Sequence, residues 1–240
     1  MRQSAFAGMA FGVLTIVTGC ESLPADLGGV LGTIGSEAPL TSAEIDAGLR
    51  QALELGTNSV TSRLGQDGGF FNDTNIRIPL PGRLATLQAE LGKVGLSGPL
   101  DDVQTRMNAS ASAAMPEARR LVVNAIQSMT LEDALGILRG GDTAATDFLR
   151  GRTEDSLRSA FSPFVNQALA ESGTFQALDS IGDRYALGAV TSDVRSDLTS
   201  HAVNLGLDGL FFYVAAEEKK IREEPVARTT ELLRRVFGSI

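Results

Sequence analysis

The sequence has few of the residues on which catalytic and metal sites commonly depend. Among 240 residues it has no tryptophan, two tyrosines, one cysteine and one histidine. One cysteine cannot form an internal disulfide, and one histidine leaves too few ligands for a zinc site and little for a histidine-based catalytic triad. We therefore expect no metal, no cofactor and no enzymatic activity, and we assign no catalytic residue.

Positive charge is also in short supply. The chain carries 21 lysines and arginines against 29 aspartates and glutamates, a formal net charge of −8. This balance repels phosphate backbones and excludes a general nucleic-acid binder. What the chain does have is a hydrophobic share of 43%, which can bury a sizeable core. Alanine and leucine are abundant, and both are strong helix formers.

The first twenty residues have the three parts of an export signal. Arg2 supplies a short positive end, an apolar run follows, and small residues precede Cys20. The apolar run is shorter than the roughly twenty residues of a transmembrane helix. We therefore predict a signal peptide over residues 1–19, a flexible glycine-containing tether over 20–40, and one helical domain over 41–240.

Residues 17–20, Val-Thr-Gly-Cys, resemble the lipobox of bacterial lipoproteins. The resemblance implies cleavage before Cys20 and acylation of this cysteine, so that lipid attaches the protein to a membrane. Each buried methylene contributes about 0.8 kcal/mol, and two or three acyl chains make a lasting anchor. Glu21 stands where many lipoproteins retained in the inner membrane have aspartate, which implies the periplasmic face of the outer membrane. The alternative is an ordinary secretory signal with a chance cysteine.

From Thr41 onward the pattern is that of an all-α, single-domain bundle of several helices. Residues 41–44 and 130–133 have the pattern of helix N-terminal caps, and Pro116 falls inside a long apolar period that it should kink or split. Between Phe148 and Thr153 we expect one helix to end and another to start. Gly206 is expected to end a helix, because glycine often follows the last helical turn.

The segment near residues 69–79 departs from the helical period. Ile76, Ile78 and Leu80 alternate with polar residues or proline, and an Asn/Asp-rich turn lies before them. This pattern is compatible with a short β-hairpin. The neighbouring prolines cannot donate ladder hydrogen bonds, so the hairpin could only be a brief edge element.

Several motifs, taken together, resemble a known family. They are residues 75–81 (NIRIPLP), 107–108, 125–130, 142–146, 207–211 (LDGLF) and 217–233 (EEKKIREEPVARTTELL). Their order and spacing are similar to those of the bacterial family of domain of unknown function 4197 (DUF4197). The resemblance implies a helix-dominated exported or lipidated protein. It carries no established activity and no catalytic residues, and residues 109–111 are less charged than it would lead us to expect.

The charged residues of these motifs are our candidate site. In an extended segment Arg77 faces away from Ile76 and Ile78, so it could pair with the C-terminal helices and clamp this segment to the bundle. The alternative is a polar pocket for an anionic ligand. The residues of this clamp or pocket are Asn75, Arg77, Glu218, Arg222 and Arg228.

Our leading functional hypothesis is a non-enzymatic, lipid-anchored periplasmic module that binds an envelope protein or another envelope component. It follows from an anchor, a tether and a folded body that lacks a recognisable catalytic constellation. One alternative is a small-molecule or lipid carrier with a pocket between its helices. Another is a hydrolase that uses carboxylates and arginine.

Overall fold

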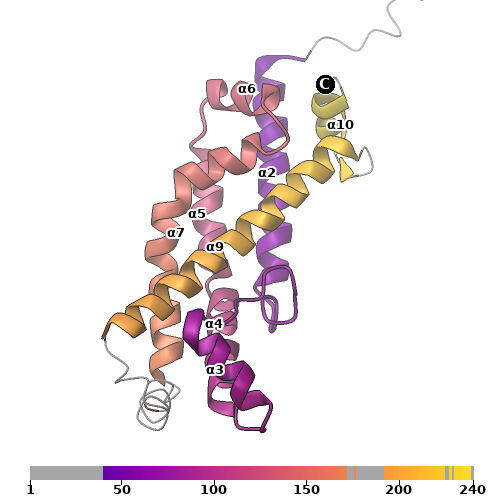
Figure 1. The fold of residues 1–240 in the computed structure, drawn as a ribbon. Helices are drawn as coiled ribbons and strands as arrows, with labels where there is room; N and C mark the ends of the chain where they lie inside the picture. Colours follow the sequence, from indigo (N-terminus) through magenta and orange to yellow (C-terminus); the bar gives the residue numbers. More distant parts are fainter. Residues whose placement is uncertain (1–39, 172–175, 177–191, 225–226, 229, 239–240) are drawn as a thin grey trace, which may run out of the picture. The chain divides into compact units, whose positions relative to one another are not determined.

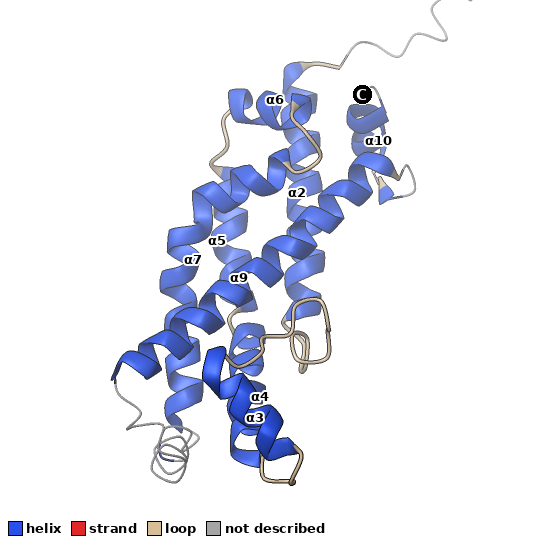
Figure 2. Ribbon diagram, viewed as in Figure 1, coloured by secondary structure: helices blue, strands red, loops and turns tan. Residues whose placement is uncertain are grey.

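The prediction of an all-α fold is confirmed. The computed structural model describes residues 40–171, 176, 192–224, 227–228 and 230–238, and the regular elements in these residues are helices, with no strand among them (Figure 2). The helices are α2 (Ser42–Leu64), α3 (Gly82–Gly92), α4 (Gly98–Ala113), α5 (Met115–Gln127), α6 (Leu131–Arg139), α7 (Ala144–Glu171), α9 (Ser192–Glu223) and α10 (Glu231–Gly238).

Three helices run side by side and a fourth crosses them. α5 lies between α2 and α7, and α9 passes diagonally over this layer, packing against α2, α4 and α7 (Figure 1). α6 packs on α2 and α7, and α10 packs on α2 near the same end. At the other end α3 contacts α4. The crossing of α9 places its final turns among the ends of α2, α6 and α7.

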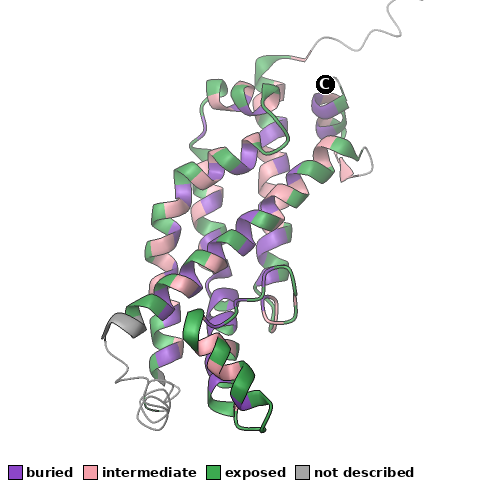
Figure 3. Ribbon diagram, viewed as in Figure 1, coloured by how far each residue is buried: buried purple, intermediate pink, exposed green. Residues whose placement is uncertain are grey.

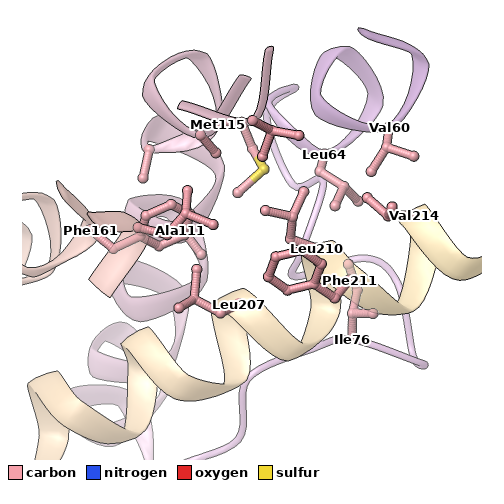
Figure 4. Close-up of a cluster of buried hydrophobic side chains, with 14 of the residues drawn as sticks. Val60, Leu64, Ile76, Ala111, Met115, Phe161, Leu207, Leu210, Phe211 and Val214 are labelled. Atoms are coloured by element: carbon pink, nitrogen blue, oxygen red, sulfur yellow. The ribbon is translucent and has the colours of Figure 1, made fainter. Parts of the chain in front are cut away.

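The core lies where these helices meet. Buried residues lie mainly where the helices face one another, and exposed residues on their outer sides (Figure 3). Removing apolar surface from water at about 25 cal/mol per Å² is the main force that holds such a bundle together. Figure 4 shows one buried cluster, formed by Val60, Leu64, Ile76, Ala111, Met115, Phe161, Leu207, Leu210, Phe211 and Val214.

Gly206 does not end a helix, so this prediction is wrong. α9 continues from Ser192 to Glu223 without a break. A Cβ atom at Gly206 would lie 3.5 Å from the Phe161 ring, and one at Gly209 would lie only 2.9 Å from Cε1 of Phe70. Close packing therefore requires glycine at 209, which can outweigh the cost of about 1 kcal/mol for glycine inside a helix, whereas the contact at Gly206 is an ordinary one that a side chain could make.

α7 is also one helix, and the boundary expected between Phe148 and Thr153 is absent. Instead of capping a new helix, the Thr153 hydroxyl donates a hydrogen bond to the carbonyl oxygen of Leu149, one turn earlier, at 2.7 Å. Threonine can satisfy its hydroxyl in this way inside a helix, so its presence alone does not mark a helix start.

Other local signals are confirmed. Thr41 Oγ1 accepts a hydrogen bond from the Glu44 backbone N–H at 3.2 Å, and the Glu44 carboxylate accepts one from the Thr41 N–H at 2.9 Å. Thr130 and Asp133 form the same reciprocal box at the start of α6. The segment that contains Pro116 is split into α4 and α5, with the proline in the first turn of α5, where it needs no N–H donor.

Residues 69–79 form a series of turns instead of the β-hairpin that the pattern allowed. The alternation itself is correct, because Ile76, Ile78 and Leu80 are buried and the residues between them are exposed. The backbone of this segment hydrogen-bonds with a side chain instead of with a second strand. Asn108 on α4 accepts from the Ile78 N–H at 2.9 Å and donates to the Ile78 carbonyl oxygen at 2.8 Å.

The predicted signal peptide, Cys20 and all of the tether except its last residue fall within residues 1–39, outside the described residues. In the part of the chain that the structure describes, no single helix has the length and hydrophobicity to cross a membrane. One bent pair, Gly98–Gln127 with Leu131–Arg139, meets that criterion by length and composition only.

Candidate functional site

Glu218 caps a helix other than its own. It lies near the C-terminal end of α9, where this helix passes the first turn of α7, and only 7% of the residue is exposed. Its carboxylate accepts hydrogen bonds from the backbone N–H groups of Ala145 at 3.0 Å and Thr146 at 2.8 Å, and from the Thr146 hydroxyl at 2.8 Å. A carboxylate satisfies unpaired N–H groups at a helix N-terminus and complements the positive end of the helix dipole.

Arg222 lies one turn after Glu218 and joins the same contact. Its Nε and Nη2 donate to Glu218 Oε1 at 3.0 and 2.9 Å, and Nη2 also donates to the carbonyl oxygen of Ile137 at 2.9 Å. Ile137 lies in the last turn of α6, where its carbonyl oxygen also accepts from the Gly140 N–H at 3.2 Å and where positive charge is favoured. The ion pair therefore ties α9 to the end of α6 and the start of α7.

Arg228 completes the arrangement beyond the end of α9. Its Nε donates to the Ile221 carbonyl oxygen at 3.1 Å and its Nη2 to the Arg222 carbonyl oxygen at 2.8 Å, both in the final turns of α9. We call Glu218, Arg222 and Arg228 the cap cluster, because each of them binds backbone groups at a helix end. Three of the five predicted site residues thus come together.

The space beside the cap cluster is small. A gap of about 20 Å³ is lined by Glu218 and Arg222 together with apolar residues of α2, α7 and α10. A volume of this size holds one water molecule. The contacts of the cap cluster therefore favour a structural role for these three residues over a pocket for an anionic ligand.

Asn75 and Arg77 lie elsewhere, in the loop between α2 and α3, which we call the 65–81 loop. Both are exposed. The Asn75 backbone N–H donates to Asp73 Oδ1 at 3.0 Å, and Arg77 Nε donates to the Phe71 carbonyl oxygen, with the guanidinium 5.0 Å from the Phe71 ring centroid. Among the described residues no ion pair joins Arg77 to the C-terminal helices, so the expected long-range clamp through Arg77 is not formed.

The 65–81 loop is held to the bundle by a residue that the sequence analysis missed. The hydroxyl of Tyr213 on α9 donates to the Asp73 carboxylate, and the Arg63 guanidinium lies 3.8 Å from the Tyr213 ring centroid. The hydrogen bond from Tyr213 lowers the pKa of Asp73, while burial and this same hydrogen bond raise the pKa of Tyr213. A tyrosine between core residues of a helix, in need of a hydrogen-bond partner, was the signal that could have identified it.

A hollow of about 400 Å³ opens beside this contact, and Arg63, Asp67, Asn72 and Asp73 are among its lining residues. Its lining is polar and mixed in charge. In the described part of the chain no group of three or more His, Cys, Asp or Glu residues could hold a metal ion. The hollow therefore has no donor set that would assign it a cation.

Arg50 on α2 was also missed. Its guanidinium donates to the carbonyl oxygens of Ile126, Gln127 and Met129, at 2.6, 2.9 and 2.6 Å, and pairs with Asp46 at 2.8 Å. The hydrogen bond with Asp46 raises the pKa of Arg50. Arg50 thus caps the C-terminus of α5 as Arg222 caps that of α6, and nothing in the local sequence points to partners this far along the chain.

A second candidate for binding is a groove between α2, α9 and α10, with a volume of about 380 Å³. Its lining residues are Leu55, Gly56, Ser59, Glu217, Lys220, Ile221, Glu224, Ala227 and Leu233. Leu55 is 44% exposed, and Lys220 pairs with Glu217 at 3.9 Å. A Cβ atom added at Gly56 would lie 3.7 Å from Glu217 Cβ, an ordinary contact, so the packing does not require glycine at this position.

The comparisons with known proteins agree with the resemblance of the motifs. A family model described as "Protein of unknown function (DUF4197)" matches residues 39–238. No curated protein and no solved structure matches the chain. The family match covers both the 65–81 loop and the cap cluster, and its description names no activity. The chain therefore belongs to the DUF4197 family.

Proposed function

We propose that this protein is a non-enzymatic binding module of the bacterial envelope. Lipid on Cys20 holds it at the periplasmic face of the outer membrane. The groove between α2, α9 and α10 receives an apolar side chain of a partner protein. In the partner this apolar residue stands next to a basic residue. The observation that carries the proposal is this groove, which combines apolar lining residues with acidic residues.

The dimensions and chemistry of the groove suit this role. Its volume of about 380 Å³ falls within the roughly 300–1,000 Å³ of ligand-binding sites. Leu55 and Ile221 supply apolar surface, above the buried side chain of Leu233. Of the charged lining residues, Lys220 pairs with Glu217, which leaves Glu224 to attract a basic group.

The contacts of the other charged residues support a binding role over a catalytic one. Arg50, Glu218, Arg222 and Arg228 all bind backbone groups at helix ends. A residue used in this way is held in place by the fold and is not presented to a substrate. The hydrolase alternative would therefore need other residues than Glu218 to carry the chemistry.

Site-specific photocrosslinking in intact cells tests the groove. A photoreactive residue in place of Leu55 is expected to give one protein adduct of defined mass. The same residue in place of Phe212, which is 51% exposed on α9 but outside the groove, should not give it. Gly56→Leu, which fills the groove, and Glu224→Lys, which reverses its charge, should each reduce the adduct.

Other outcomes distinguish the alternatives. A Leu55 adduct of small-molecule mass would favour the carrier hypothesis. Equal adducts at both positions, or none at Leu55, would contradict the groove as the binding site. Cys20→Ser is expected to move the protein out of the membrane fraction, and a variant that stays with membranes would contradict the lipid anchor.

A further inference from the structure

The outer face of α6 is the best-defined surface outside the groove and the cap cluster. The inner face buries Ala134 and Ile137, where α6 packs on α2 and α7. The outer face borders a shallow hollow of about 510 Å³ that is lined by Leu131, Glu132, Leu135, Gly136 and Arg139. Leu131 is 43% exposed and Leu135 is half-buried. The surface is thus a short apolar strip beside two opposite charges.

The two charges are placed symmetrically about the middle of the helix. Glu132 lies in the first turn of α6 and Arg139 in its last turn. Seven residues are close to two turns, so both side chains project from nearly the same side, about 10 Å apart along the axis. Neither side chain forms an ion pair within the described ranges, in contrast to neighbouring Asp133, which lies 3.7 Å from Arg152.

Gly136, next to the midpoint between these charges, leaves the backbone bare. A Cβ atom added there would meet nothing within 4 Å, so the packing of this chain does not require glycine. Glycine inside a helix is destabilising relative to alanine. A bare backbone at the centre of an exposed strip lets another helix approach closely, which would explain the residue.

We propose that the outer face of α6 binds the same face of a second copy of this chain. The two α6 helices cross antiparallel about a two-fold axis that passes near Leu135 and Gly136. Glu132 of each copy then faces Arg139 of the other. A face with a negative charge at its start and a positive one at its end is complementary to itself only in this antiparallel arrangement, which is the isologous contact of a two-fold dimer.

The surface is small, and this sets the strength of the contact. Nine residues span about 13 Å, and a pair of such helices buries less than the roughly 1,200 Å² typical of stable interfaces. We therefore expect weak association in solution and a stronger one when the chains share a membrane, which raises their effective concentration. The stronger association expected on a membrane rests on the proposed anchor, whereas the weak association expected in solution does not.

Cysteine crosslinking tests the two-fold geometry in two arms. In cells the variants keep Cys20, and in purified protein at high concentration they carry Cys20→Ser. Leu135→Cys, near the axis, should form a disulfide-linked homodimer. Glu132→Cys alone and Arg139→Cys alone should not, but chains carrying one of each should crosslink when mixed. Phe212→Cys, exposed on α9, is the control that should stay monomeric, and so is the chain with no added cysteine.

Charge exchange tests the pairing. In the Leu135→Cys background, Glu132→Arg alone and Arg139→Glu alone should each lower the crosslinked fraction about tenfold, because each places like charges opposite one another. The two together should restore the fraction to within about twofold, since they rebuild the same pair with its sign reversed. Gly136→Leu should abolish crosslinking while the melting temperature of the monomer does not fall.

The outcomes distinguish a failure of the two-fold contact from a failure of the proposed membrane effect. Crosslinking in solution but not in cells would contradict the stronger association expected on a membrane and leave the two-fold contact in place. No crosslink at Leu135→Cys in either arm, crosslinking of Glu132→Cys with itself, or a double charge exchange that fails to restore the fraction would each overturn the two-fold contact.

Discussion

The cap cluster and the 65–81 loop use similar residues to different ends. Both contain arginine and a carboxylate, and in both the arginine lies within a motif of the same family. In the cap cluster Glu218 is buried and Arg222 partly buried, and their partners include backbone groups of α6 and α7. In the loop Arg77 is exposed and binds the carbonyl oxygen of nearby Phe71. Burial, more than residue type, decides whether a charged side chain holds helices together or makes contacts only within its own turn.

The sharpest way to break this comparison is to remove Glu218. Glu218→Ala leaves Arg222 buried without its counter-charge and the first turn of α7 without a cap, so we expect a loss of about 3–5 kcal/mol in unfolding free energy. Urea denaturation followed by circular dichroism measures it. Glu217→Ala, on the same helix but half-exposed, is the matched control and should change stability by no more than about 0.5 kcal/mol. A loss at Glu218 as small as that of the control would refute the structural role.

Asn108 tests how firmly the loop itself is attached. Asn108→Ala leaves the N–H of buried Ile78 without its partner and the Ile78 carbonyl oxygen with only the Gln104 side chain at 3.4 Å, and we expect a loss of about 2 kcal/mol. Asn124→Ala, an exposed asparagine on α5, should be nearly neutral. Hydrogen exchange adds a local measurement, because the Ile78 amide should exchange faster in Asn108→Ala. An unchanged Ile78 amide would mean that the side chain does not hold the loop.

Acid should weaken the N-terminal cap of α2 and, to a smaller extent, the contact between α2 and α10. Hydrogen bonds from Thr41, with Arg235 as a further donor, lower the pKa of Glu44 from 4.5 to about 2. Because the folded-state pKa lies below the unfolded one, the stabilisation is fully present above pH 4.5 and is lost as pH falls toward 2. The difference in urea midpoint between wild type and Glu44→Gln should therefore shrink across this interval. A difference that stays constant with pH would exclude the charge of Glu44 as its cause.

The smallest effect is expected at Arg77. Arg77→Ala removes an exposed side chain whose contacts stay within its own loop, so unfolding free energy should change by no more than about 0.5 kcal/mol. Differential scanning calorimetry is sensitive enough to compare it with Glu218→Ala. A loss above about 2 kcal/mol would restore the hypothesis of a long-range clamp through Arg77.

The features that the sequence predicted well are those with short-range causes. The box of Thr41 and Glu44 and the break at Pro116 depend on residues within one or two turns. The family was recognisable for a similar reason, because its motifs are contiguous. The alternation over Ile76, Ile78 and Leu80 was also read correctly as a pattern of burial.

The features that it missed depend on what lies across the fold. Gly206 is a residue typical of helix ends, but it lies inside α9, where this helix packs against Phe161 of α7. In the same way, Arg50 and Glu218 could be recognised as charged residues, but the backbone groups that they cap lie more than seventy residues away. No local pattern encodes these partners, so the candidate site was predicted by residue type and not by role.

The long reach of the C-terminal contacts also bears on when the protein can fold. Glu218 and Arg222 complete helices that precede them by 73 and 85 residues, and Arg235 reaches Glu44, 191 residues earlier. The contacts of Glu218 and Arg222 with the backbone at the start of α7 and the end of α6 can therefore form only after the last segment has been synthesised. Such non-local closure slows folding. Because these contacts come from the C-terminal part of the chain, stability depends on its presence. A chain truncated before the end of α9 should therefore be more susceptible to proteolysis.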